Sequence, residues 1–342
     1  ELTTSYKLRC STTWRDRLVF RVLSLHGARS VDLNEAANRI VVGIESPAVR
    51  SAVLALADSV GVPRVALDFD AARKVVPTQG TVGSTIDGRF RPVLGGIRIG
   101  PRGCTLTVTA YWGGAPVMIT NSHCSATTNA LDFGPWNQPW YTGTLTPETS
   151  PFGAELFDSN GWRCWDGLNP QRCRHAEVSV YSFDGAVLAP GETSAFQLGR
   201  IARTQERLYG PNVPSRLAAG TINRNIDATQ PSFEIVGSIS YPLQGEIVDK
   251  VGTTSGWTYG PVYDTCYDYS DNRGRIMMCQ DRADVGANPG DSGSPVFKYD
   301  PGTGQVRFMG MLWARETSGT GGVFSNVQQM QREIGNFVVS WY

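Results

Sequence analysis

The segment at residues 290–295 reads Gly-Asp-Ser-Gly-Ser-Pro, which is the composition of a turn that could carry a nucleophile. A nucleophilic serine needs a tight turn that exposes its hydroxyl and aims backbone amides at the oxyanion formed during attack. Flanking glycines permit both. We therefore predict Ser292 as the nucleophile and the amides of Gly290 and Ser292 as the oxyanion hole. The alternative is an ordinary hairpin turn without chemistry.

A second segment, residues 120–124, reads Thr-Asn-Ser-His-Cys and follows an apolar, strand-like stretch. The chain has only 3 histidines, and this one adjoins Cys124, which we expect to pair with Cys104. A histidine held in this way, in a chain that also carries the serine motif, is predicted to be the general base, so we assign that role to His123. A lone histidine is more often structural than catalytic.

The two motifs, their order and their spacing resemble the chymotrypsin-type serine peptidases, in particular the bacterial streptogrisin and α-lytic branch. Residues 93–97 (VLGGI) resemble the start of the mature enzyme in that branch, and residues 250–256 (KVGTTSG) resemble the strand before its specificity loops. The resemblance implies an all-β double Greek-key β-barrel of the trypsin-like kind, with no metal or cofactor. Residues 38–46 (NRIVVGIES) look like the family's pro-domain, which assists folding and then inhibits.

The family's third catalytic residue is an aspartate between the histidine and the serine, and this sequence departs from that pattern. The matching segment has Glu177 where the aspartate is expected. A carboxylate there would accept a hydrogen bond from the Nδ1–H group of His123. Glutamate is one methylene longer than aspartate, so this extra length decides the geometry of the contact, unless Asn121 compensates. Asp184 competes for the role, but its odd separation from Glu177 places it on the opposite face of an unbroken strand.

The resemblance also implies substrate-binding positions, at Gly286, Trp313, Ala314, Arg315 and Gly321. Gly286 occupies the position where trypsin-like members carry an aspartate, so cleavage after basic residues is not expected. Arg315 either attracts an acidic residue of the substrate or pairs with Glu316. Tryptophans in the insertion at 133–165 either contact substrate or pack within their own loop, and packing is the favoured interpretation.

Asp291 is expected to need a buried cation. In this sequence Arg91-Pro92 precedes the mature-like start, and trypsin-type cleavage before proline is poor. A newly formed chain terminus is therefore not expected to pair with Asp291. We predict an internal arginine as its partner.

The 7 cysteines include no CxxC motif, which argues against a zinc site or a redox pair. Six of them form sequence-local pairs, so three disulfides are predicted, at Cys104–Cys124, Cys164–Cys173 and Cys266–Cys279. Cys10 remains single. Disulfides of this kind are typical of exported proteins.

Two regions with different patterns of apolar and turn residues indicate two domains. Residues 38–46 predict a strand, 47–60 a helix and 64–69 a second strand, so residues 1–80 are expected to form a small α/β domain, with Trp14–Leu25 as a further possible helix. Residues 81–95 are predicted to be a linker because they are rich in Gly, Thr and Ser. Short strands separated by turns then follow over residues 96–342, ending in a predicted helix at 327–339.

Composition limits the function classes. Lys plus Arg equals Asp plus Glu at 31 each, so the formal net charge is zero. Electrostatic attraction of the whole chain to nucleic acid or to an acidic membrane is therefore not expected. No apolar run is long enough to cross a bilayer, and any export signal is expected to have been removed. The sequence thus predicts a secreted, monomeric serine endopeptidase precursor that acts on proteins or peptides. The alternatives are a weakened or inactive homologue that binds protein, or a protein whose function lies in its N-terminal domain.

Overall fold

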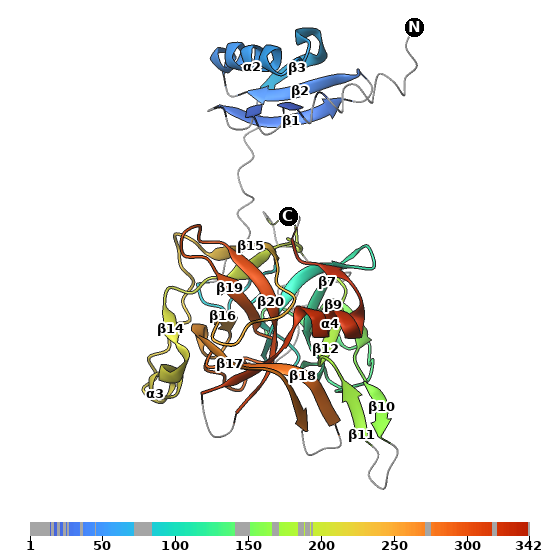
Figure 1. Ribbon diagram of the computed structural model, residues 1–342, viewed down its shortest axis with the longest axis vertical. Helices are drawn as coiled ribbons and strands as arrows, with labels where there is room; N and C mark the ends of the chain where they lie inside the picture. The colour runs from blue at the N-terminus through green and yellow to red at the C-terminus, as the bar shows by residue number, and fades with distance from the viewer. Residues whose placement is uncertain are drawn as a thin grey trace. The chain divides into compact units, whose positions relative to one another are not determined.

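Figure 1 shows the computed structural model of the chain. It describes residues 14, 17–18, 21–22, 25, 27–34, 37–44, 46–71, 84–140, 151–165, 171–183, 188, 192, 194–270, 275–316 and 320–340. The chain divides into two compact units, residues 1–78 and 79–342. None of the helices in the described ranges is both long and apolar enough to cross a membrane.

Over its described residues, the first unit is a three-stranded sheet with the helix α2 (Figure 1). Residues 14, 17–18 and 21–22, within the helix predicted at Trp14–Leu25, are also helical. Its elements are β1 (Ala28–Asn34), β2 (Arg39–Ile44), α2 (Pro47–Ser59), the short 3-10 turn η1 (Arg64–Ala66) and β3 (Leu67–Ala71). β2 is antiparallel to β1 and parallel to β3, so α2 forms the crossover connection. Pro47 begins α2 directly after Ser46, as the Ser-Pro start predicts. The sequence did not predict β1.

The second unit is mostly β. A six-stranded sheet contains β6 (Val108–Trp112), β7 (Ala115–Asn121), β8 (Pro135–Asn137), β9 (Pro151–Asp158), β12 (Val178–Tyr181) and β22 (Phe337–Val338). A two-stranded sheet pairs β4 (Arg98–Ile99) with β5 (Cys104–Thr105). Short helices are η2 (Ser122–Cys124), η3 (Gly210–Asn212), α3 (Val213–Ala218) and α4 (Val327–Ile334).

An eleven-stranded sheet forms the rest of this unit. Its strands are β10 (Trp162–Trp165), β11 (Gln171–Arg174), β13 (Arg200–Ala202), β14 (Arg207–Tyr209), β15 (Ser232–Ser238), β16 (Ile247–Gly252), β17 (Gly256–Ser270), β18 (Arg275–Ala283), β19 (Pro295–Tyr299), β20 (Val306–Arg315) and β21 (Gly322–Asn326). β11 pairs in parallel with β18, which attaches the β10–β11 hairpin to the edge of this sheet (Figure 1).

One hydrophobic cluster joins the two large sheets. Val117 and Ile119 of β7 pack in the same cluster as Phe297 of β19 and Phe308 of β20, and all four are fully buried. Successive side chains along these strands point to opposite faces of the sheet. The faces that do not enter this cluster can therefore hold polar groups near the turns. The two sheets therefore form a single body.

The segment predicted to be a linker, residues 81–95, is not one over its described part. Ile86, Phe90, Val93 and Leu94 are buried in a core cluster of the second unit. These apolar residues are isolated among glycines and polar residues and follow no helix or strand period, so the pattern gave no sign of burial.

The C-terminal helix is shorter than the predicted 327–339. Asn326 caps it by accepting the amide of Gln329 at 3.0 Å, and α4 ends at Ile334. Gly335 then adopts φ 74°, a left-handed conformation that suits glycine at a helix end. The chain continues into β22, which pairs with β6.

Candidate active site

Ser292 sits in a turn that requires glycine at two positions. Gly290 has φ 98° and Gly293 has φ 86°. A Cβ at Gly293 would lie 2.0 Å from the carbonyl oxygen of Thr105, which is backbone and cannot move aside. The amide of Gly293 donates to Leu312 O at 2.8 Å, and Ser292 O accepts from the amide of Thr105 at 2.8 Å. The turn is therefore fixed between β20 on one flank and β5 on the other.

Two amides of this turn are available to a ligand. The amides of Asp291, Gly293 and Ser294 donate to carbonyls of the protein. Within the described residues, no hydrogen bond is formed by the amide of Gly290 or of Ser292. These two N–H groups belong to the same short turn as the Ser292 hydroxyl, so they could donate to an oxygen that becomes negative when the hydroxyl attacks.

Asp291 points away from solvent into a polar network. Its Oδ1 accepts the amides of Thr254 at 2.9 Å and Ser255 at 3.1 Å, and its Oδ2 accepts the amide of Asn288 at 3.0 Å. The Nζ of Lys250 lies 3.4 Å from the same Oδ2, and both side chains are completely buried. Burial lowers the pKa of Lys250, and the charge of Asp291 opposes that shift. The predicted internal arginine is therefore wrong: the cation is a lysine.

His123 lies at the end of β7, in the turn η2. Its Nδ1 is 2.5 Å from Oε2 of Glu177. The His123 side chain is 31% exposed and that of Glu177 only 4%, so one ring edge can reach solvent or substrate while the other faces a buried carboxylate. A carboxylate only accepts, so Nδ1 carries the hydrogen and Nε2 is free to act as a base.

The main chain explains how Glu177 reaches the ring. β12 pairs with β7 so that Val178 faces Asn121. The carbonyl of Glu177 accepts the amide of Ser122 at 3.1 Å and the Nδ2 of Asn121 at 3.1 Å. These bonds fix Glu177 next to the His123 turn, and the extra methylene lets its carboxylate meet Nδ1. Asp184, the competing carboxylate, lies outside the described residues.

The disulfide Cys104–Cys124 brings the two motifs together. A ring nitrogen of His123 lies within 4.8 Å of both sulfur atoms. The Sγ of Cys124 lies 3.9 Å from Ser292 O. The imidazole and the serine turn therefore adjoin the same sulfur atom. Because both cysteines are oxidised, this cluster is not a metal site.

The other predicted disulfides are described in part. Cys266 and Cys279 are bonded, at the β17–β18 hairpin. Cys173 is also disulfide-bonded, and the side chain of its predicted partner Cys164 lies outside the described residues, as does Cys10.

The predicted substrate-binding residues differ in exposure. Trp313 is 9% exposed, and its indole nitrogen donates to Oε1 of Gln280 at 2.8 Å, so its ring is mainly a packing group rather than a cleft wall. Ala314 is half-buried and Arg315 is exposed. The suggested pairing of Arg315 with Glu316 is not the contact present, because Glu316 binds Arg282 at 2.8 Å.

The two predicted glycines of the pocket are tightly enclosed. A Cβ at Gly286 would lie 2.5 Å from Cγ2 of Val213. A Cβ at Gly321 would lie 2.2 Å from the hydroxyl of Tyr263. Gly286 requires glycine, because its φ is 59° and a Cβ would also lie 2.7 Å from the backbone oxygen of Gly210. At Gly321 a side chain would have to displace the Tyr263 and Glu316 side chains.

A buried carboxyl lies beneath the His123 turn. Oδ2 of Asp158 accepts the amide of Ala130 at 3.1 Å, and the residue is 6% exposed. Burial raises the pKa of Asp158 to about 7; the nearby charge of Glu155 adds to the shift and that of Arg174 opposes it. The sequence analysis did not single out Asp158 or Lys250. Lys250 could have been noticed as a charge inside a strand that is otherwise buried.

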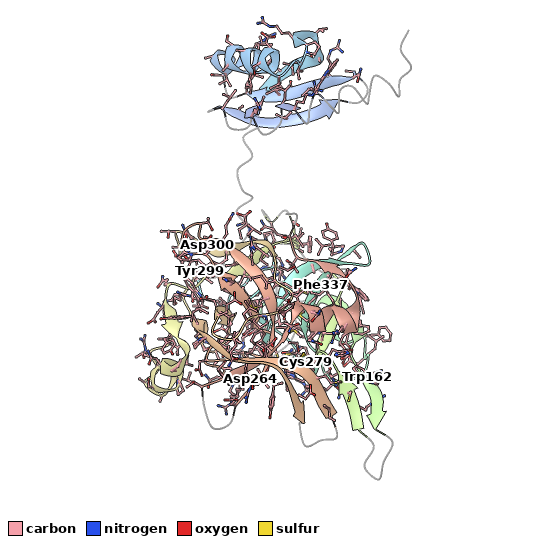
Figure 2. All side chains as sticks on the ribbon, in the orientation of Figure 1. Trp162, Asp264, Cys279, Tyr299, Asp300 and Phe337 are labelled. Carbon is pink, nitrogen blue, oxygen red and sulfur yellow. A yellow bond between two sulfur atoms is a disulfide. The ribbon has the colours of Figure 1, made fainter. Side chains whose placement is uncertain are left out.

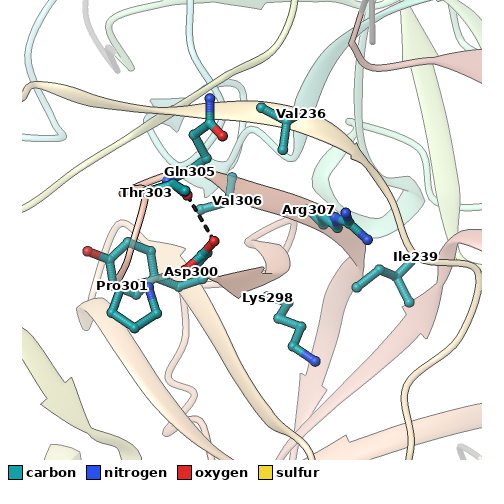
Figure 3. A pocket seen from close by; sticks show the side chains of 10 residues that line it. Val236, Ile239, Lys298, Asp300, Pro301, Thr303, Gln305, Val306 and Arg307 are labelled. Atoms are coloured by element: carbon teal, nitrogen blue, oxygen red, sulfur yellow. Dashed lines mark hydrogen bonds between the residues drawn. The ribbon is translucent and has the colours of Figure 1, made fainter.

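A pocket of about 440 Å³ lies elsewhere in this unit (Figure 3). It is lined by Val236 and Ile239, by Lys298 and by the β19–β20 turn, where Thr303 donates to Asp300 at 3.0 Å. Figure 2 shows Tyr299 and Asp300 far from Asp264 and Cys279 of the β17–β18 hairpin. None of Ser292, His123 and Glu177 lines this pocket, so it is not part of the candidate active site.

Comparison with known proteins gives a fold likeness alone. No protein-family model and no curated protein matches the sequence. Among solved structures, a glutamic acid-specific serine protease matches with a TM-score of 0.45 and 17% identity, covering 72% of this chain and 100% of its own. Protease A of Thermobifida fusca gives 0.45 and 15% over 72% and 98% of the two chains. The Nocardiopsis protease gives 0.44 and 18% over the same shares. These scores are below 0.5, so the likeness carries no conclusion about function.

Proposed function

We propose that this chain is a serine endopeptidase that acts on proteins or peptides, with Ser292 as nucleophile, His123 as general base and Glu177 as the group that orients the imidazole. One observation carries the proposal. The imidazole has a buried carboxylate 2.5 Å from Nδ1 and adjoins, across one sulfur atom, a serine turn with two unbonded amides.

These groups could perform acyl transfer in two halves. The Ser292 hydroxyl oxygen bonds to the peptide carbonyl carbon while its proton passes to Nε2 of His123. The carbonyl oxygen takes the displaced electron pair and accepts the amides of Gly290 and Ser292. The carbon–nitrogen bond then breaks, and His123 gives its proton to the leaving amine. Water repeats the steps on the acyl-enzyme and frees the acid product and Ser292.

Glu177 has a positioning role in this scheme. By accepting the Nδ1 hydrogen, it fixes the tautomer in which Nε2 is a base, and its negative charge stabilises the imidazolium that forms. The proposal extends to a double β-barrel architecture, to an exported and monomeric protein, and to a first unit that assists folding or restrains activity. It requires no metal or cofactor.

Covalent labelling tests the proposal. A fluorophosphonate should add to the purified full chain with the mass of one phosphonyl group, and the adduct should map to Ser292. Ser292→Ala and His123→Ala should abolish labelling, whereas Ser215→Ala, which changes an exposed serine on α3, should not. A folded chain that is never labelled at Ser292 would support the alternative of a non-catalytic homologue.

A further inference from the structure

The serine turn has two flanks with different neighbours. The amide of Gly293 bonds β20, and Ser292 O accepts from Thr105 of β5. The resemblance assigns Gly286, Ala314 and Gly321 to substrate binding. Ala314 lies in β20, Gly321 O accepts the amide of Glu316 just after β20, and Gly286 donates to Thr320 O at 2.9 Å, so all three lie on the β20 flank. On the proposed function, the acyl half of a substrate occupies that flank, so the leaving half extends over the β5 flank.

An aromatic ring stands on the β5 flank. Gly103 O lies 3.6 Å from the position that a Cβ would take at Gly290, so Gly103 adjoins the predicted oxyanion hole. A Cβ on Gly103 would in turn lie 3.1 Å from Cε2 of Trp140. The indole nitrogen of Trp140 donates to Pro101 O at 3.2 Å, and the guanidinium carbon of Arg98 lies 3.9 Å from the ring centroid. The ring is therefore held in place by a hydrogen bond and a cation–π contact.

Arg102, the residue before Gly103, contacts the turn that follows His123. Its Nη2 donates to Ala126 O at 2.8 Å, and Ala126 follows His123 by only three residues. The residue is exposed, and among the described residues it pairs with no carboxylate. A guanidinium has five N–H donors, so several remain for a ligand.

The charge of this flank is not balanced. Arg98 and Arg224 share one carboxylate, that of Asp87, at 3.5 and 2.8 Å. Arg224 also donates to Thr253 O at 3.3 Å, and the hydroxyl of Thr253 donates to Gly290 O at 2.9 Å, which places this arginine beside the same turn. Asp132 is the second described carboxylate here, because it accepts the amide of Thr127, next to Ala126, at 2.7 Å. With Arg102, three described cations therefore stand against two described anions.

We propose that Arg98, Arg102, Trp140 and Arg224, here called the arginine flank, select substrates with an acidic side chain at the first or second residue after the cleaved bond. An aspartate or glutamate there would accept hydrogen bonds from the unused donors of Arg102. A lysine at the same position would face an excess of positive charge. This inference rests on the proposed function, because that function defines which substrate half lies on the flank.

Peptide cleavage by the full chain tests the preference. A diverse synthetic peptide mixture is digested, and mass spectrometry reads the two residues after each cleaved bond. The best-cleaved peptide is then made with Asp, Ala or Lys at the position where the digest shows the stronger selection. We expect kcat/KM for the Asp peptide to exceed that for the Lys peptide about tenfold, the size expected for one partly exposed ion pair. The ratio should shrink between about 0.05 and about 0.5 M salt.

Variants of Arg102 locate the effect. Arg102→Ala should lower the Asp-to-Lys ratio to about threefold or less, and Arg102→Glu should invert it. Arg307→Ala, which removes an exposed arginine of β20 beside the separate pocket, is the matched control and should leave the ratio unchanged. Equal kcat/KM for the three peptides, or an unchanged ratio in Arg102→Glu, would overturn the proposal.

A failure of catalysis gives a different result. If no peptide is cleaved and Ser292 is not labelled, the proposed function fails. The flank is then tested by binding, with a peptide Ala-Ala-Ala-Ala-Asp-Ala and its Lys counterpart titrated into the full chain and into Arg102→Glu. Tighter binding of the Asp peptide that is reversed by Arg102→Glu would keep the arginine flank as an acidic-peptide site. Equal binding of both peptides would dismiss it.

Discussion

Lys250 places its ammonium nitrogen 3.4 Å from the carboxylate of Asp291, the residue directly before the predicted nucleophile, and neither side chain reaches solvent. The carboxylate also accepts three backbone amides of the surrounding loops. An internal cation therefore holds the serine turn in the form that exposes its amides. On the proposed function, this turn is built without a newly cut chain terminus.

Replacing the buried lysine should disrupt the turn. Lys250→Met leaves the Asp291 carboxylate buried without a cation, which should cost about 3–5 kcal/mol of unfolding free energy. Labelling of Ser292 by a fluorophosphonate should slow at least about 100-fold, the loss typical of one missing oxyanion donor. Lys298→Met is the control, because its half-exposed ion pair with Glu246 should be worth about 1 kcal/mol or less. Denaturant unfolding and labelling rates measure both effects. A Lys250→Met protein as stable as the control would contradict this role.

The length of the Glu177 side chain should matter to catalysis. Glu177→Asp withdraws the carboxylate by one methylene from a contact that is now 2.5 Å, and the backbone that carries it is fixed by Ser122 and Asn121. We expect kcat to fall at least about tenfold, and Glu177→Gln to lower it by about 10³–10⁴, because the imidazole tautomer is lost. Steady-state kinetics on a cleaved peptide, with circular dichroism to confirm folding, would show this. Full activity in Glu177→Asp would mean that another group orients His123.

The parts of the site that are local in sequence could be predicted, and the parts made by tertiary contact could not. The serine turn has its glycines within four residues, and the cysteine of the histidine turn directly follows the histidine. Both patterns can therefore be recognised in the sequence. Lys250 and Asp291 are 41 residues apart, and nothing in either segment indicates that they meet. The sequence analysis predicted an internal arginine, which differs from lysine in shape but supplies the same charge.

The fold shows the same division. The strand β2 and the helix α2 follow clear periods and lie within one or two residues of the predicted bounds. In contrast, Phe90 stands between arginines, yet its side chain is 1% exposed. The parallel pairing of β11 with β18 joins segments about a hundred residues apart, and edge pairing of this kind has no local signal.

Alanine substitutions at two glycines allow the cost of backbone strain to be distinguished from the cost of close contact. Gly293 and Gly304 have φ 86° and 75°, so alanine is strained at both, by about 1 kcal/mol. A Cβ at Gly304 would meet nothing within 4 Å, whereas at Gly293 it would lie 2.0 Å from Thr105 O. Gly293→Ala should therefore lower the unfolding free energy by at least about 2 kcal/mol more than Gly304→Ala. Urea unfolding of the two variants measures the difference. Equal losses would mean that the turn is not clamped against β5.

Asp158 should make stability depend on pH near neutrality. Burial raises its pKa to about 7 from the ordinary 3.8, so between these values the folded chain keeps a proton that the unfolded chain has released. The stability contributed by the neutral carboxyl is thus complete below about pH 4 and is lost as the pH rises to about 7, with a slope of up to about 1.4 kcal/mol per pH unit.

Asp158→Asn isolates that term, because the amide oxygen can still accept the amide of Ala130 but does not titrate. The unfolding free energy of the wild type minus that of the variant should fall from about pH 4 to about pH 7 and be level above it. Glu155 also has a raised pKa, caused mainly by burial, but it is present in both proteins and should largely cancel from the difference. Chemical unfolding at closely spaced pH values gives this curve. A difference that is flat, or that rises with pH, would show that Asp158 is ionised in the folded protein well below neutrality.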